Sequence, residues 1–290
     1  MPALVPRDRT IRIQRVLLGL LFANLAVVGA KFVIGMTTNS LAVIGDGVHS
    51  SVDAVNNVLA LTVMWVAARE PDEDHPYGHT KFETLGALAI VVLLSVGGFE
   101  LIKGAVYRLV HGTEPLNITG MQIAVLGGTL VINTVVAIYE TRQGHALHSD
   151  LLLADAAHTR VDVFITLGVL AGVALSRAGY PSADPIVALF VAVAVVWVAW
   201  GIVRRSVPVL VDEQALPPDQ IRVAAEAVAG VRSAYHVRSR GLPHHRFAEL
   251  TIAVEGSATV SAAHEIADAV EQRLRDHLQV HEVIVHVEPC

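Results

Sequence analysis

The chain has 290 residues, a mean hydropathy of +0.54, 17% charged residues and a formal net charge of −6. Soluble domains carry about a quarter charged residues, so this composition favours an integral membrane protein, and its acidic balance argues against nucleic-acid binding. The single cysteine, Cys290, excludes an intrachain disulfide.

Six apolar segments are each long enough to cross a bilayer, which takes about 20 helical residues. They cover residues 16–34, 41–68, 85–110, 121–139, 151–175 and 183–203. We predict that they form an all-α transmembrane domain of six spans over residues 1–208. The first segment is too long for a signal-peptide core and is therefore interpreted as a retained span.

The basic residues predict the orientation of these spans, because lysine and arginine gather on the cytoplasmic side of a membrane. They lie before the first span, between the second and third, between the fourth and fifth, and after the sixth; they are Arg7, Arg9, Arg12, Arg15, Arg69, Lys81, Arg142, Arg204 and Arg205. We therefore expect both termini in the cytoplasm. The compact chain and its short loops favour a bacterial inner membrane.

The sequence becomes soluble in character after Arg205, and residues 209–290 are expected to form a cytoplasmic domain. Proline in the first turn and amphipathic spacing predict a helix from Pro218 to about residue 229. Strands are predicted over 234–239, 248–254 and 282–288, with a loop at 241–245 and a second helix over 261–277. This αββαβ order favours a ferredoxin-like α+β domain with its helices on one face of a sheet.

Two of the apolar segments carry the same pattern of ionisable residues. Asp46, His49 and Asp53 lie on the second segment, and Asp155, His158 and Asp162 on the fifth. Each triplet follows the spacing i, i+3, i+7, which places its members on one stripe of a helix. A charged side chain at the bilayer centre costs roughly 2.5–3.5 kcal/mol even on insertion scales, so each triplet needs a compensating partner.

The two stripes can meet face to face and form a metal site. His49, Asp53, His158 and Asp162 together offer two nitrogens and two oxygens, a ligand set that suits tetrahedral Zn²⁺ without excluding other metals. Asp46 and Asp155, one turn earlier, can orient a ligand histidine or carry protons.

Single polar residues in spans have a simpler explanation, since they commonly join neighbouring helices by hydrogen bonds. The span asparagines Asn24, Asn56, Asn57 and Asn133 are interpreted in this way.

The chain as a whole resembles the cation diffusion facilitator family. The features that carry the resemblance are the six spans, the paired histidine–aspartate motifs, the sequence from His75 to His79 after the second span, and the αββαβ tail. Members of this family exchange divalent metals for protons and work as homodimers. The resemblance covers nearly the whole chain. It implies that His49, Asp53, His158 and Asp162 form the transport site. His49 stands where the zinc-type members of the family also have a histidine, so the resemblance implies Zn²⁺ as the transported metal, with Co²⁺, Cd²⁺, Fe²⁺ and Mn²⁺ as alternatives.

The same resemblance implies two further metal sites outside the spans. Asp72, His75 and His79 match a site in the loop after the second span, where a solvated acidic turn is the alternative explanation. His236, His264, His286 and Glu288 match ligands at the dimer interface of the cytoplasmic domain, where Zn²⁺ would be regulatory. Thr251 and Glu288 replace a histidine and an aspartate of that pattern, which places the usual two-metal cluster in doubt.

The function predicted from the sequence is efflux of a divalent cation, Zn²⁺ foremost, by proton antiport with alternating access. Two alternatives remain open at this point. One is a membrane zinc hydrolase, which would need an open coordination position for water. The other is a membrane-anchored metal sensor, against which the acids within the spans argue.

Overall fold

The computed structural model describes residues 6–37, 41–112, 119–180 and 183–290, without the side chains of residues 6, 7, 41–43, 45, 46 and 49. Six long helices occupy the first part of the chain: α1 (Pro6–Thr37), α2 (Leu41–Ala67), α3 (Lys81–His111), α4 (Gly120–Ala146), α5 (Asp150–Arg177) and α6 (Ala183–Leu210). Each contains a stretch long and apolar enough to cross a membrane. The six predicted spans are therefore confirmed, and most of the helices extend several residues beyond the apolar segments.

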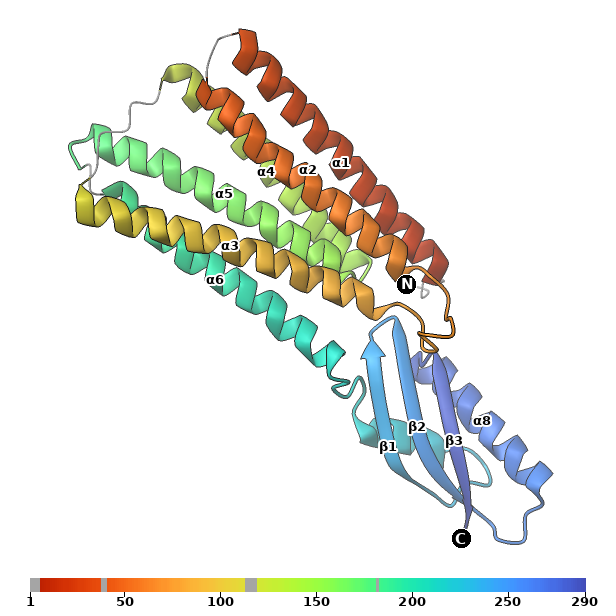
Figure 1. The fold of residues 1–290 in the computed structure, drawn as a ribbon. Coiled ribbons are helices and arrows are strands. Elements are labelled where there is room, and N and C mark those ends of the chain that lie inside the picture. The colour runs from red at the N-terminus through yellow and green to blue at the C-terminus, as the bar shows by residue number, and fades with distance from the viewer. Residues whose placement is uncertain (1–5, 38–40, 113–118, 181–182) are drawn as a thin grey trace. The chain divides into compact units, whose positions relative to one another are not determined.

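The membrane helices pack mainly against their neighbours in the chain, and α3 with α5 is the main contact between helices that do not follow one another (Figure 1). α1 lies along α2, α4 lies along α5, and α3 contacts both α2 and α5. Gly86 allows the close approach of α3, because a Cβ atom there would lie 2.5 Å from Cγ1 of Val63 on α2 and 3.1 Å from Cδ1 of Leu151 on α5.

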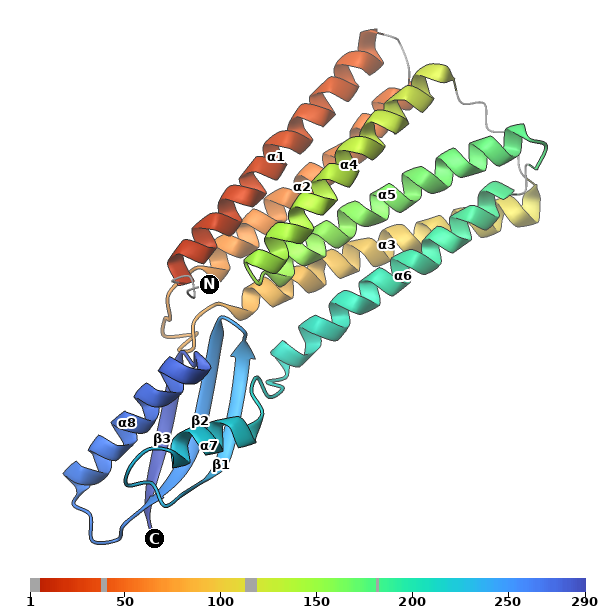
Figure 2. The same ribbon diagram turned by 180° about the vertical axis from the view of Figure 1, so that it is seen from behind.

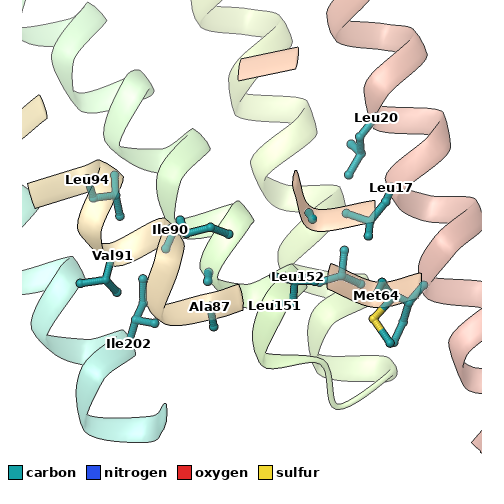
Figure 3. Close-up of a cluster of buried hydrophobic side chains, with 14 of the residues drawn as sticks. Leu17, Leu20, Met64, Ala87, Ile90, Val91, Leu94, Leu151, Leu152 and Ile202 are labelled. Carbon is teal, nitrogen blue, oxygen red and sulfur yellow. The ribbon is translucent and has the colours of Figure 1, made fainter. Parts of the chain in front are cut away.

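A hydrophobic cluster joins five of these helices near one end of the bundle (Figure 3). Figure 3 shows its side chains from α1, α2, α3, α5 and α6 meeting between the ribbons; they include Leu17, Leu20, Met64, Ala87, Ile90, Val91, Leu94, Leu151, Leu152 and Ile202. Fully burying an aliphatic side chain of this size contributes about 1.5–3 kcal/mol in water, and close packing adds dispersion contacts that persist in lipid. This cluster therefore holds the five helices together by close packing.

A buried polar cluster fixes the same end. Arg9 of α1 makes an ion pair with Glu83 of α3, with Nη1 and Oε2 3.0 Å apart, and both side chains are at most 7% exposed. Arg9 also donates to the main-chain oxygens of Leu147 and His148. Ser149 caps the start of α5 and donates its hydroxyl hydrogen to Glu83.

The contacts of the chain divide it into two units, with the division between Ser206 and Val207, so that α6 runs across it. The second unit contains α7 (Pro218–Glu226), β1 (Ser233–Leu242), β2 (His245–Val254), α8 (Val260–Leu278) and β3 (Glu282–Pro289). The αββαβ prediction is confirmed. The predicted 241–245 loop is shorter than expected, because the strands continue to Leu242 and resume at His245, and the first helix ends at Glu226 rather than near 229.

The sheet of this unit has the order β1-β2-β3, with β1 antiparallel and β3 parallel to β2. Figure 2 shows α7 and α8 on the same face of the sheet. Apolar side chains from that face and the helices form a separate core; its fully buried members are Ile221, Ala225, Ile252, Val270 and Leu274. Alternation along the strands therefore directs the remaining side chains to the uncovered face.

Candidate metal sites

Three residues of the two predicted triplets meet between α2 and α5. Nε2 of His158 lies 3.4 Å from Oδ1 of Asp53 and 3.8 Å from Oδ2 of Asp162. The ligand atoms of all three residues lie within 4.8 Å of one another. Their side chains are 15–23% exposed, and Nδ1 of His158 is buried without a hydrogen bond to any described residue. One nitrogen and two oxygens at this spacing can hold a divalent cation.

The other three members of the triplets differ in what the structure describes. The side chains of Asp46 and His49 lie outside the described residues, so the fourth predicted ligand stays a prediction. Asp155 is 3% exposed and accepts a hydrogen bond from Asn57 at 3.2 Å. It therefore lies one helical turn from His158 as a buried neighbour of the site.

Two asparagines predicted to join neighbouring helices, Asn56 and Asn57, do so through hydrogen bonds, and they lie against the residues of this site. Nδ2 of Asn56 is 3.2 Å from Nε2 of His158, the same nitrogen that faces the two aspartates. Asn57 bonds Asp155 and accepts from Asn24 of α1. Asn56 and Asn57 are at most 3% exposed. Their position just after Asp53 on the same helix was the available sequence signal.

Two charged residues within the spans were not predicted from the sequence. Lys31 of α1 is 4% exposed and donates to the hydroxyl of Ser50 at 2.8 Å. Glu140 of α4 is 1% exposed and accepts a hydrogen bond from Thr159 at 3.0 Å. Lys31 is the one charged residue of the first apolar segment, and the cost of a charge in a membrane was the available signal. Glu140 follows the fourth apolar segment directly, with Arg142 two residues later, so the sequence did not separate it from the charged end of that helix.

The loop between α2 and α3 brings its three predicted ligands together. Asp72 Oδ1 lies 3.1 Å from Nδ1 of His75, and its Oδ2 lies 3.3 Å from Nε2 of His79. The two imidazole centroids are 4.3 Å apart, and Phe82 stacks on His79. His79 is 3% exposed, and its Nδ1 makes no hydrogen bond within the described structure.

The carboxyl group of Asp72 is held in its charged form by this arrangement. Desolvation raises its pKa, but hydrogen bonds from the main chain and ring of His75, with the charges of His79 and His75, outweigh that effect and lower the pKa overall. An ionised carboxylate between two imidazoles is the state that binds a metal.

The four predicted ligands of the second unit are spread over three elements. His286 and Glu288 alternate on β3, with Nε2 and Oε1 3.5 Å apart, while His264 is an exposed residue of α8 that pairs with Asp268. His236 is exposed, in a left-handed conformation (φ 51°), at an irregularity of β1 between Tyr235 and Arg238. Among the described residues of one chain, these four form no group of three converging ligands.

Two neighbouring side chains modify the β3 pair. Thr251 is buried and lies opposite His286 in the β2–β3 register. Tyr235 donates its phenolic hydrogen to Glu288, and this hydrogen bond raises the pKa of the Tyr235 hydroxyl. One carboxylate oxygen of Glu288 is thus already hydrogen-bonded within the chain, to Tyr235.

Two family models together match most of the chain. A cation efflux transmembrane domain matches residues 17–211, and a cation efflux cytoplasmic domain matches residues 217–290. The cation-efflux pump FieF of Cronobacter sakazakii is 29% identical over 87% of this chain and 85% of its own length. The manganese efflux system protein MneP of Bacillus subtilis is 25% identical over 95% of this chain and 96% of its own.

Among solved structures, the copper form of the MamM C-terminal domain is 33% identical, covers 25% of this chain and 71% of its own, and has a TM-score of 0.24. The transmembrane model alone covers well over half of the chain. The chain therefore belongs to the cation diffusion facilitator family and is an integral-membrane divalent-cation efflux transporter, not an enzyme, with a cytoplasmic C-terminal domain.

Proposed function

We propose that the chain exports zinc in exchange for protons, with Asp53, His158 and Asp162 as the transport site and His49 as the fourth ligand. The observation that supports this most directly is the convergence of the three described ligand atoms to within 4.8 Å on two candidate spans. The intervals between these residues correspond to facing helix stripes, and the cost of acids within a span favours a cation-binding role.

The donor set favours zinc over manganese. Imidazole nitrogen suits Zn²⁺, whereas Mn²⁺ prefers carboxylate, carbonyl and water oxygens. His158 supplies a nitrogen that faces both aspartates. Manganese is the second candidate cargo, since the similar protein MneP is a manganese efflux system protein.

Proton coupling follows from the chemistry of the ligands. A histidine coordinates metal only when neutral, and carboxylates only when ionised, so binding of the cation displaces protons and protonation expels the cation. We therefore infer that His158 binds either the cation or a proton, and exchanges one for the other. We infer that α-helices rocking about this site expose it alternately to either side of a bacterial inner membrane, with both termini in the cytoplasm.

Two accessory sites complete the proposal. Asp72, His75 and His79 form a second zinc site, supported by their mutual contacts and by the hydrogen-bonding atom of His79 left unused within the described structure. The cytoplasmic domain, over residues 209–290, joins two copies of the chain into a homodimer, in which His236, His264, His286 and Glu288 bind regulatory zinc across the interface. The match to the cytoplasmic domain of cation efflux proteins supports the dimer.

The test is metal flux into proteoliposomes, with and without an imposed pH gradient. We expect gradient-dependent Zn²⁺ flux that Asp53→Ala and Asp162→Ala abolish, while Glu100→Ala retains it. Glu100 is the matched control because it is an exposed acid of α3 paired with Lys103. Flux of Mn²⁺ but not Zn²⁺ would overturn the choice of cargo, and flux that survives both aspartate substitutions would overturn the site.

A further inference from the structure

Glu140 is the most completely buried acid of the described membrane unit. It lies on α4, within a candidate span over Gly120–Ala146, and is 1% exposed. One carboxylate oxygen, Oε2, accepts a hydrogen bond from the hydroxyl of Thr159 at 3.0 Å. Thr159 follows His158 directly in the chain, so Glu140 is connected to the helix that carries two of the proposed metal ligands.

The carboxyl group has no ion-pair partner within 4.0 Å among the described side chains. Arg160 of α5 is the cation that acts on it, but Arg160 is an exposed residue and its Nε donates to the main-chain oxygen of Ala156. A buried carboxylate that lacks a paired cation is very costly in its ionised form, so in the metal-free protein the group holds a proton.

Glu140 also faces the acidic stripe of α5. The other charged groups that act on it are Asp155 and Asp162, and both are acids of that stripe. α1 and α2 also contact α4, but no charged side chain from their described residues contributes to its electrostatic surroundings. A cation held by Asp53, His158 and Asp162 would add positive charge to that stripe, and it would favour the ionised carboxylate of Glu140.

We propose that Glu140 is a proton-exchanging residue of the transport reaction: the protonated carboxyl group releases its proton to solvent when a divalent cation binds at Asp53, His158 and Asp162, and takes one up when the cation leaves. The step balances, since Glu140–COOH and the incoming cation give Glu140–COO⁻, the bound cation and one proton. The hydroxyl of Thr159 stabilises the ionised form by donating to it. This inference rests on the proposed function and adds a residue on α4 to a site otherwise built from α2 and α5.

The experiment counts protons released per Zn²⁺ bound by the purified full-length chain in weakly buffered detergent solution, with a pH-indicator dye. Glu140→Gln keeps the size of the side chain but cannot ionise, and it should release fewer protons per zinc ion, by up to one. Glu140→Asp should retain the release. Glu100→Gln is the matched control, an exposed acid of α3, and should behave as the unsubstituted chain.

Equal proton release by Glu140→Gln and the unsubstituted chain would overturn the inference, because a purely structural Glu140 would leave the count unchanged. If Glu140→Gln does not fold, Thr159→Val keeps the carboxyl group and removes its hydrogen bond. It should then shift the pH at which zinc-linked proton release is half-maximal, and an unshifted profile would overturn the inference. No zinc-linked proton release from the unsubstituted chain would instead overturn the proposed antiport.

Discussion

Gly86 is a single residue whose hydrogen side chain determines how closely two helices approach α3. A methyl group there would lie 2.5 Å from Cγ1 of Val63, a β-branched side chain that cannot turn aside without leaving its preferred rotamer. By contrast, a methyl group added at Gly97 of the same helix would have no neighbouring atom within 4 Å. The two glycines therefore provide a matched pair for measuring overpacking.

We expect Gly86→Ala to lower the free energy of unfolding by about 1–3 kcal/mol, the usual cost of an extra methyl group in a packed core. Gly97→Ala should leave it unchanged or raise it by roughly 0.5–1 kcal/mol, because alanine loses less backbone entropy in a helix. Thermal unfolding of the two variants in detergent compares them directly. Equal midpoints would show that α2 and α3 do not pack as the structure has them.

The sequence predicts the residues of the site better than their surroundings. Asp53, His158 and Asp162 follow fixed intervals on helices, and such intervals determine which side chains share a face. Glu140 belongs to no repeated interval, and its burial depends on the rotation of α4 against α5, which apolar composition alone does not specify. Asn56 and Asn57 were predicted to be in spans, but their contact with the acidic stripe required the pairing of α2 with α5.

At the scale of elements, the cluster around Arg9 connects α1, α3 and the start of α5. The sequence indicated Arg9 only as one of the basic residues that mark the cytoplasmic side, whereas the structure buries it at 5% exposure against Glu83. Its donors also bond two main-chain oxygens of the connection between α4 and α5. The long separation between partners in the chain, rather than any local pattern, explains why the sequence did not predict this cluster.

We expect Glu83→Leu to destabilise the chain by about 3–5 kcal/mol, because it leaves the charge of Arg9 buried and unpaired. The double variant Arg9→Met, Glu83→Leu should be more stable than Glu83→Leu alone, since it removes that charge. Glu100→Leu should cost under about 1 kcal/mol, as its pair with Lys103 is exposed. A double variant no more stable than the single one in thermal unfolding would contradict the assignment of the cost to the unpaired charge.

At the scale of the whole molecule, the chain divides into two units with separate cores, and they are expected to respond differently to acid. The second unit holds His245 at the start of β2, with its ring centroid 4.1 Å from that of His281. Burial, together with the charge of His281, lowers the pKa of His245 to about 4. An unfolded histidine has a pKa of about 6.5, so the unfolded chain binds more protons between these two values.

Because protonation of His245 favours the unfolded chain, the contribution of this residue to stability is fully present above about pH 6.5 and is lost as the pH falls towards 4. We expect the unfolding temperature of the cytoplasmic unit to fall over that range, and His245→Gln, which cannot take up a proton there, to fall less. His277→Gln is the control, because His277 is an exposed residue of α8 with no proposed role in metal binding. Scanning calorimetry of the full chain from about pH 7 to about pH 4.5 makes the comparison. If the unfolding temperature falls equally with pH in His245→Gln and in the unsubstituted chain, the His245–His281 contact does not govern the acid sensitivity of this unit.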